Sequence, residues 1–321
     1  MTLSGPLSRR SMLTLAVVLP WSGVVSARAA APVSSMRYTM TTFTNLSQTD
    51  MWVYESTDAT NFSLVAAAAY RPPQADPAGT PASGVTDKKG LCRDPSVFRH
   101  VDGAYYVVYT TAWDGNTIGF ARSVDRIVWT FLYEYTIPLP GVSHTWAPEW
   151  FVDGAGTVHI VVSVHDGTAF RPHLMTATDP SLSAQQWTVP TPLPGITPAP
   201  DTPGYIDTTV VLARGRYHAF VKNESTKYVE VAIADDLAGP YEFVRTGNWA
   251  RWGAPREGQC VIRLPDGRWR IYLDAYNLDN PEYGRYLYSD TVTDDLLGAW
   301  TTPQDLPGLS GFVRHFTVLP E

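Results

Sequence analysis

Apolar and aromatic residues occur along this chain in short runs that polar turns separate, and the same order of runs recurs. An apolar strand, a turn that contains glycine and a second strand rich in aromatic residues follow one another four times. Glycine accepts the positive φ that a tight hairpin turn demands, so each occurrence predicts a β-hairpin. The predicted hairpins span residues 95–110, 149–163, 208–221 and 259–274, with turns at Asp102-Gly103, Asp153-Gly154, Arg214-Gly215 and Asp266-Gly267.

Each hairpin is followed by an outer strand, a turn that contains Asp and a final strand that holds an aromatic residue. These second units are 118–123 with Trp129, 174–177 with Trp187, 229–234 with Tyr241 and Phe243, and 286–289 with Trp300. We expect the repeated Trp129, Trp187 and Trp300 to pack the units together. A fifth copy, 51–54 with Phe62, lacks a first strand. Residues 312–319 are expected to supply that strand by pairing with residues 37–43.

The spacing of the turn glycines indicates how these units are arranged. They are 51, 61 and 52 residues apart, which suits four-stranded blades around an axis. The sequence therefore predicts an all-β fold over residues 35–321: a five-bladed β-propeller with four-stranded blades, closed by pairing of the N- and C-terminal strands. A β-sandwich or two unrelated all-β domains are the alternatives, and no long helical period competes.

Residues 1–31 differ from the rest of the chain. Arg9 and Arg10 precede an apolar run at 12–21 and small residues at 26–31, a pattern that predicts a signal peptide. The string Ser8-Arg9-Arg10-Ser11-Met12-Leu13 resembles a twin-arginine export signal; an ordinary secretory signal is the alternative. An uncleaved anchor is disfavoured because the apolar run is short. The mature protein is therefore expected in the periplasm or outside the cell.

Charge and cysteine content narrow the partners. Residues 1–29 hold three arginines and no acids, so 21 basic and 31 acidic side chains remain without them, a net charge of −10. Such a balance disfavours nucleic acid as a partner, and we expect a monomer that binds no membrane once mature.

Cys92 and Cys260 are the only cysteines; both are expected to be buried, with a single disulfide as the alternative.

The innermost strands hold the candidate chemistry. In a propeller the first strand of each blade lines the central channel, so the starts of these strands converge. Four of the five starts carry a carboxylate, and crowded carboxylates often mark a functional site. The starts are Arg93-Asp94-Pro95, Trp146-Ala147-Pro148-Glu149, Tyr205-Ile206-Asp207-Thr208, Arg256-Glu257-Gly258 and Arg314-His315-Phe316.

The order of these motifs resembles glycoside hydrolase family 43 and its five-bladed relatives, the arabinanases, α-L-arabinofuranosidases and β-xylosidases. The resemblance extends from about residue 37 to residue 319. It implies that Asp94, in Arg-Asp-Pro-Ser-Val, is a general base. It also implies that Asp207, in Ile-Asp, orients the acid and tunes its pKa, and that Glu257, in Glu-Gly, is the general acid.

Inversion at a sugar needs one carboxylate that activates water and a protonated one that donates to the leaving oxygen. A third charge near Glu257 would favour its protonated form by repulsion, a role that falls to Asp207. Each residue also has a structural alternative. Asp94 could cap a turn before Pro95, Asp207 could bond backbone amides, and Glu257 could pair with a surface cation.

Further residues are expected to contact substrate. Arg93 adjoins Asp94, and Trp146 and Glu149 occupy the second blade start. Trp146, Trp249 and Trp252 could stack on sugar faces, with ordinary packing as the alternative. His315 resembles a fifth-blade histidine that lies on the channel axis beside a water molecule or a calcium ion. Phe316 replaces the usual glycine there, and no cofactor is expected to be required.

The predicted function is hydrolysis of arabinose- or xylose-containing oligosaccharides or polysaccharides by an inverting acid/base mechanism. One alternative is a retaining fructan or sucrose hydrolase, which Arg93-Asp94-Pro95 and Cys260 favour and the absence of Asn-Asp-Pro disfavours. A second alternative is an exported propeller that binds sugars without cutting them.

Overall fold

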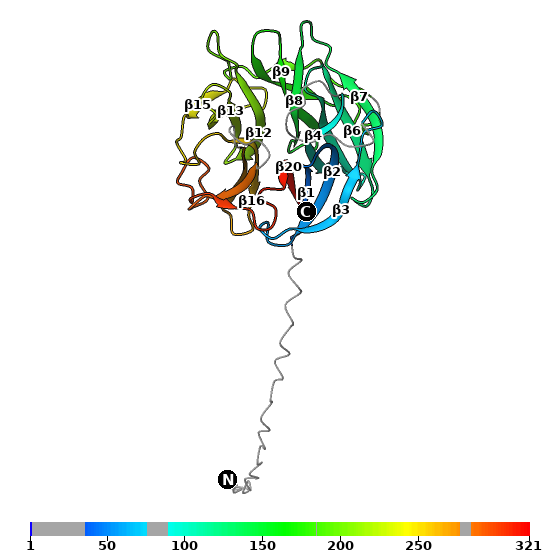
Figure 1. The fold of residues 1–321 in the computed structure, drawn as a ribbon. Helices are drawn as coiled ribbons and strands as arrows, with labels where there is room; N and C mark the ends of the chain where they lie inside the picture. The colour runs from blue at the N-terminus through cyan, green and yellow to red at the C-terminus, as the bar shows by residue number, and fades with distance from the viewer. Residues whose placement is uncertain (2–35, 76–88, 184, 277–283) are drawn as a thin grey trace. The chain divides into compact units, whose positions relative to one another are not determined.

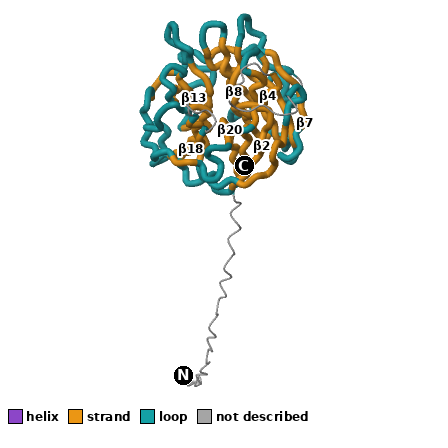
Figure 2. Tube along the Cα trace, viewed as in Figure 1, coloured by secondary structure: helices purple, strands orange, loops and turns teal. Residues whose placement is uncertain are grey.

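The computed structural model describes Met1 and residues 36–75, 89–183, 185–276 and 284–321. The predicted leader therefore lies outside the described residues, and so does the export route that depends on it. Residues Met36–Glu321 form one compact unit. Within the described residues, no helix is long and apolar enough to cross a membrane; Figure 2 shows only strands and loops there.

In the described residues, twenty strands form five antiparallel four-stranded sheets, as predicted. We number the blades by chain order: blade 1 is β4–β7, blade 2 is β8–β11, blade 3 is β12–β15, blade 4 is β16–β19, and blade 5 is β20-β1-β2-β3. The strands are β1 (Tyr38–Thr44), β2 (Ser47–Ser56), β3 (Ser63–Tyr70), β4 (Lys89–Arg99), β5 (Tyr105–Ala112), β6 (Thr117–Ser123), β7 (Thr130–Thr136), β8 (His144–Val152), β9 (Val158–His165), β10 (Phe170–Thr176), β11 (Thr191–Pro192), β12 (Tyr205–Ala213), β13 (Arg216–Asn223), β14 (Val229–Ala234), β15 (Glu242–Arg245), β16 (Glu257–Arg263), β17 (Trp269–Ala275), β18 (Arg285–Asp290), β19 (Gln304–Asp305) and β20 (Val313–Pro320).

The predicted closure of the ring is confirmed. Strand β20 pairs with β1, with Tyr38 opposite Pro320 and Thr39 opposite Leu319. Figure 1 shows β20, the last strand in the chain, beside the blue β1 in the middle of the blades. The Arg37 guanidinium also lies 2.9 Å from the Glu321 carboxylate. The two ends of the described propeller are therefore held together by backbone and side chains.

The four predicted hairpins are present as β4-β5, β8-β9, β12-β13 and β16-β17. One turn differs from the prediction. In the β8-β9 hairpin the glycine with positive φ is Gly156 (83°), not Gly154, because the turn spans Asp153 to Gly156 and Gly156 N donates to the Asp153 carbonyl. The other three turn glycines, Gly103, Gly215 and Gly267, have φ between 76° and 89°.

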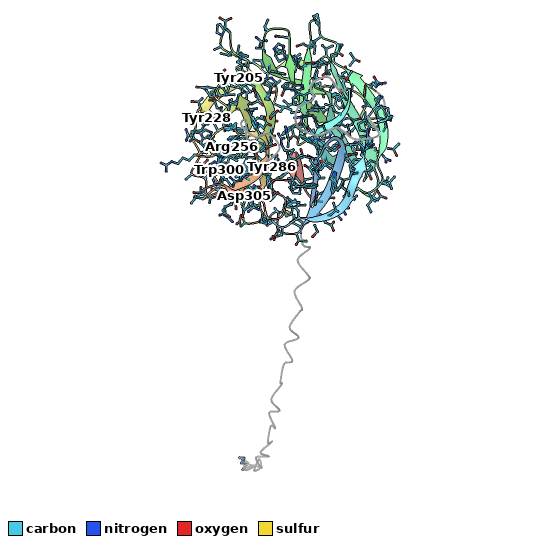
Figure 3. The ribbon with its side chains drawn as sticks, viewed as in Figure 1. Tyr205, Tyr228, Arg256, Tyr286, Trp300 and Asp305 are labelled. Atoms are coloured by element: carbon cyan, nitrogen blue, oxygen red, sulfur yellow. The ribbon has the colours of Figure 1, made fainter. Side chains whose placement is uncertain are left out.

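Hydrophobic layers between neighbouring blades form the core. In the layer between blades 1 and 2, Phe120 and Trp187 stack with ring centroids 5.6 Å apart. The repeated tryptophans pack in these layers, as predicted, but they lie beside the fourth strands and not within them. Trp187 and Trp300 form isolated bridges with Ala177 and Thr291. In Figure 3, Trp300 lies farther from the middle of the ring than Tyr286.

The cysteine prediction is settled in favour of two free, buried thiols. Cys92 and Cys260 are both free and buried. They belong to different hydrophobic layers, Cys92 between blades 5 and 1 and Cys260 between blades 4 and 5. Each behaves as a small apolar core residue.

Candidate active site

A β-bulge interrupts the innermost strand of every blade near its start. The register with the second strand shifts between Arg93 and Ser96, Trp146 and Glu149, Ile206 and Thr209, and Glu257 and Cys260. The pairing of β20 with β1 shifts in the same way between Arg314 and Thr317. Bulges bend a strand and re-aim its side chains, and they often lie beside active sites.

The bulges sort the channel-lining residues into three rings of five. We call them the first, second and third ring in chain order. The first ring is Arg93, Trp146, Ile206, Glu257 and Arg314; the second is Asp94, Ala147, Asp207, Gly258 and His315; the third is Ser96, Glu149, Thr209, Cys260 and Thr317. The four predicted carboxylates are thus not all equivalent: Asp94 and Asp207 share the second ring, Glu257 is in the first and Glu149 in the third.

Four residues of the second ring have a left-handed backbone. The φ angles are 49° at Asp94, 46° at Ala147, 54° at Asp207 and 55° at Gly258. Such a conformation is costly for a residue with a side chain, and it is retained where the surrounding structure enforces it, often at functional sites. At Gly258 a Cβ would lie 2.7 Å from the His315 ring. Glycine is therefore required there by both conformation and space.

His315 joins the two acids of the second ring. Its Nδ1 lies 3.1 Å from Asp94 Oδ1 and 3.8 Å from Asp207 Oδ2. Burial by itself would lower the pKa of His315, but the charges of Asp94 and Asp207 outweigh burial and raise the pKa to about 9. The ring is therefore a cation at neutral pH.

Asp94 is held as a carboxylate. Burial would raise its pKa, but His315, Arg93 and a hydrogen bond from Thr110 Oγ1 (2.8 Å to Oδ2) bring the pKa well below its usual range. Thr110 Oγ1 in turn accepts a hydrogen bond from the backbone N–H of Ala147. The ionised carboxylate is thus fixed from two sides.

The pKa of Asp207 is shifted in the opposite direction to that of Asp94. Burial, together with the charges of Glu257 and Asp94, raises its pKa to about 6 despite the opposing charges of His315 and Lys222. Asp207 Oδ2 accepts a hydrogen bond from Gly258 N (3.0 Å), and its own backbone N–H donates to Ser163 Oγ. Asp207 therefore does bond a backbone amide, in addition to facing the other acids.

Glu257 is paired with two cations. Lys222 Nζ lies 2.5 Å from Oε2 and Arg314 Nη2 lies 3.4 Å from Oε1, while 16% of the side chain stays exposed. Burial would raise the pKa of Glu257, but Lys222 and Arg314 lower it below the ordinary value. This corrects our expectation that Asp207 keeps Glu257 protonated: in the absence of substrate the raised pKa belongs to Asp207. The reason is the two cations: Lys222 was not among the expected site residues, and Arg314 was expected to line the channel but not to pair with Glu257.

Lys222 and Arg314 belong to a wider charged network. Lys222 Nζ is also 2.6 Å from Glu224, and Arg314 Nε is 2.5 Å from Asp274. Lys222, Asp274 and Thr110 come from second strands, which the sequence analysis did not search for site residues. A signal exists, since each stands seven residues after a turn glycine with positive φ, and Ser163 follows Gly156 by the same interval.

Glu149 lies in the third ring, apart from the other carboxylates. Its Oε2 accepts a hydrogen bond from Ser96 Oγ (2.5 Å), and Thr317 Oγ1 lies 3.2 Å from Oε1. Burial raises its pKa to about 7. With Thr209, Cys260 and other third-ring residues it lines a cavity of about 300 Å³. Its predicted contact with a sugar remains a prediction.

Trp146 and Arg93, which belong to the first ring, both contact Trp113. Trp146 Nε1 donates to the Trp113 carbonyl (2.7 Å), and the two rings meet edge to face. The Arg93 guanidinium carbon lies 4.0 Å from the Trp113 ring centroid. Trp146 is only half-buried, so the expectation that it contacts substrate stays open.

Trp249 and Trp252 belong to the hydrophobic layer between blades 3 and 4. Trp252 is 4% exposed and packs edge to face on Trp249 and Trp300. A ring so buried offers no face to a sugar, which corrects the expectation for Trp252. Trp249 is half-buried, and its Nε1 donates to the Val229 carbonyl.

The suggestion of calcium beside His315 does not fit the side chains found there. Calcium takes six to eight oxygen ligands, whereas Asp94 and Asp207 already face the His315 cation. In the part of the chain that the structure describes, no three His, Cys, Asp or Glu side chains are grouped to hold a metal ion.

No protein-family model matches the chain, and no curated protein does. Solved structures do match. An endo-1,4-β-xylanase from Bacteroides thetaiotaomicron is 13% identical, with 88% of this chain and 93% of that one covered and a TM-score of 0.61. A family-43 β-1,3-galactosidase with bound galactodeoxynojirimycin is 13% identical (85% and 90% covered, TM-score 0.58). An exo-1,5-α-L-arabinanase from a bovine ruminal metagenomic library is 18% identical (72% and 80% covered, TM-score 0.51). At these identities the likeness concerns the fold, so the chain shares a five-bladed propeller with enzymes of glycoside hydrolase family 43.

Proposed function

We propose that this protein is a glycoside hydrolase that acts on arabinose- or xylose-containing glycans. The observation that carries the proposal is the meeting of Asp94, Asp207 and Glu257 around His315, Lys222 and Arg314, although the three acids come from three blades. Structural neighbours that are named xylanase and arabinanase support the choice of substrate class. Buried ionisable groups in such a cluster are typical of catalytic sites.

In the proposed mechanism Asp94 is the base. It is ionised over the whole physiological range because His315, Arg93 and Thr110 stabilise the carboxylate. An ionised carboxylate can take a proton from a water molecule as that water attacks the anomeric carbon.

The proton for the leaving oxygen comes from the pair formed by Asp207 and Glu257. The charge of Glu257 helps to raise the pKa of Asp207 to about 6, so Asp207 takes up a proton near that pH while Glu257, beside its two cations, does not. Glu257 is the member that keeps 16% of its side chain exposed, against 6% for Asp207. We therefore assign donation to Glu257 and storage of the proton to Asp207. Lys222 and Arg314 orient the donor.

The test compares substrates with good and poor leaving groups. Glu257→Gln should retain activity on aryl glycosides whose phenol leaves without protonation and should lose activity on natural glycans. Asp94→Asn should lose activity on both. NMR of the first-formed sugar should show inversion at the anomeric carbon. A retained configuration would contradict the proposed mechanism, and equal turnover by parent and both variants would contradict the proposed function.

We also propose that the protein acts outside the cytoplasm. The proposal rests on residues 1–31, whose paired arginines and apolar run are typical of an export signal. N-terminal sequencing of the protein recovered from the periplasm or medium would test it.

A further inference from the structure

Arg93 is the first-ring cation on the Asp94 side of the candidate site. It precedes Asp94 in the chain, and its side chain is half-buried. Its ring also holds Glu257 and Arg314. Arg93 therefore occupies the same register position in blade 1 as Glu257 in blade 4.

The charge of Arg93 is less well compensated than that of the other cations at the site. Lys222 faces Glu224 and Glu257, Arg314 faces Asp274 and Glu257, and His315 faces Asp94 and Asp207, all within 4 Å. Among the described residues, no carboxylate oxygen lies within that distance of Arg93. Burial lowers the pKa of Arg93, with Asp94 opposing.

The guanidinium is nevertheless held in one place. Its carbon lies 4.0 Å from the Trp113 ring centroid and 4.8 Å from that of Phe43. Nη1 donates to Gln48 Oε1 (2.8 Å), and the same oxygen accepts from Trp113 Nε1 (3.0 Å). One hydrogen bond uses one of the five N–H donors of an arginine. The remaining donors form a preorganised fork without an acidic partner of the protein.

We propose that Arg93 binds the carboxylate of an acidic sugar, so that the substrate is a glycan that carries a uronosyl unit. The inference rests on the proposed function, whose substrate class it narrows. A planar guanidinium matches a carboxylate through two parallel hydrogen bonds, and a partly desolvated guanidinium with no carboxylate in direct contact gains most from such a partner. The net charge of −7 repels an acidic glycan at long range. Recognition must therefore come from this short-range contact.

Binding can be tested without catalysis, because free monosaccharides have no bond to cleave. The probes are D-glucuronate and D-galacturonate against D-glucose and D-galactose, at equal ionic strength, followed by NMR shifts of tryptophan indole N–H groups. We expect the acidic sugars to bind at least tenfold more tightly. Arg93→Met should abolish the preference, and Arg93→Lys, which keeps the charge but not the fork, should retain part of it. Arg285→Met, which removes an exposed cation paired with Asp305, is the matched control and should bind as the parent does.

Three outcomes would overturn the inference. They are equal affinity for acidic and neutral sugars, an unchanged preference in both folded Arg93 variants, and acetate that binds through Arg93 as tightly as glucuronate. Thermal unfolding shows whether each variant folds. If Arg93→Met does not fold, Arg93→Lys is the variant that tests the inference.

Activity separates this inference from the proposed function. Glucuronosyl-branched xylo-oligosaccharides are compared with the same compounds after reduction of the carboxylate to an alcohol. If kcat/KM is equal for the acidic and the reduced compounds, and Arg93→Lys does not alter it, the inference is overturned but the proposed glycosidase activity is not. No cleavage of either, with the binding preference intact, would overturn the proposed function and leave Arg93 as an acidic-sugar site.

Discussion

Blades 1 and 3 place an aspartate at the same point of the fold and give it opposite properties. Asp94 and Asp207 both open a bulge in the innermost strand, with φ of 49° and 54°, and both are buried. Yet the pKa of Asp94 is well below the ordinary value, and that of Asp207 is raised to about 6.

The difference comes from the second strands and from the neighbouring blades. Blade 1 presents Thr110 and Arg93 to its aspartate, and His315 is nearer to Asp94 (3.1 Å) than to Asp207 (3.8 Å). Blade 3 presents Lys222, which contacts Glu257 and not Asp207, and places Asp207 beside two other acids. A repeated backbone thus supplies a position, and the side chains around it decide the protonation state.

The largest effect is expected at Asp94. Asp94→Asn keeps the shape and the acceptor for Thr110 but cannot take a proton from water. Turnover should fall by roughly a hundredfold or more, the scale of general base catalysis. Steady-state kcat/KM on a cognate glycan measures it. An Asp94→Asn enzyme as fast as the parent would show that blade 1 does not hold the base.

The next effect concerns His315, which links the two aspartates. Its pKa is raised from 6.5 to about 9 in the folded protein, so its contribution to stability is fully present below pH 6.5 and is lost as the pH rises through about 9. The loss is up to about 3 kcal/mol. The Tm of the parent should fall over this pH window, and that of His315→Gln should fall much less. Parallel curves would contradict the raised pKa.

A smaller effect is expected at Asp207. Asp207→Asn imitates its protonated form and removes a charge beside Glu257. Turnover should fall on the order of tenfold, less than for Asp94→Asn, because proton storage is weakened while the base is retained. The alkaline limb of the pH–rate profile near pH 6, where Asp207 loses its proton, should also change. A loss equal to that of Asp94→Asn would show that Asp94 and Asp207 contribute equally to turnover, which would contradict their different roles.

The smallest effect is expected at Lys222, which lowers the pKa of Glu257. Lys222→Met should raise that pKa, so the donor stays protonated to higher pH and the alkaline limb of the profile moves up by about one pH unit. Lys227→Met is the control, because Lys227 pairs with Glu224. Carbonyl infrared spectroscopy of the Glu257 carboxyl group would measure the pKa independently of turnover.

Much of the architecture could be predicted from the sequence because the information is local. Turn glycines between aromatic strands specify hairpins, and the unpaired strands at 37–43 and 312–319 specify the closure. The same reasoning brought Asp94, Asp207 and Glu257 to one channel.

The bulges and the cations could not be predicted in this way. Once the bulges align the strands, Glu257 corresponds to Arg93 and not to Asp94, so the two acids lie in different rings, and the sequence alone did not show this alignment. Lys222 stands at the end of an apolar second strand, where its charge has meaning only once Glu257 of the next blade lies 2.5 Å away. The pKa order of the acids depends on such contacts between distant segments.

The strand that closes the ring also supplies Arg314 and His315. A ribosome makes β20 last, so a nascent chain can have four blades formed and still lack two of the cations that face the acids. The candidate centre assembles only when the two extremities of the propeller meet, and shortened polypeptides that end before β20 would accumulate without it.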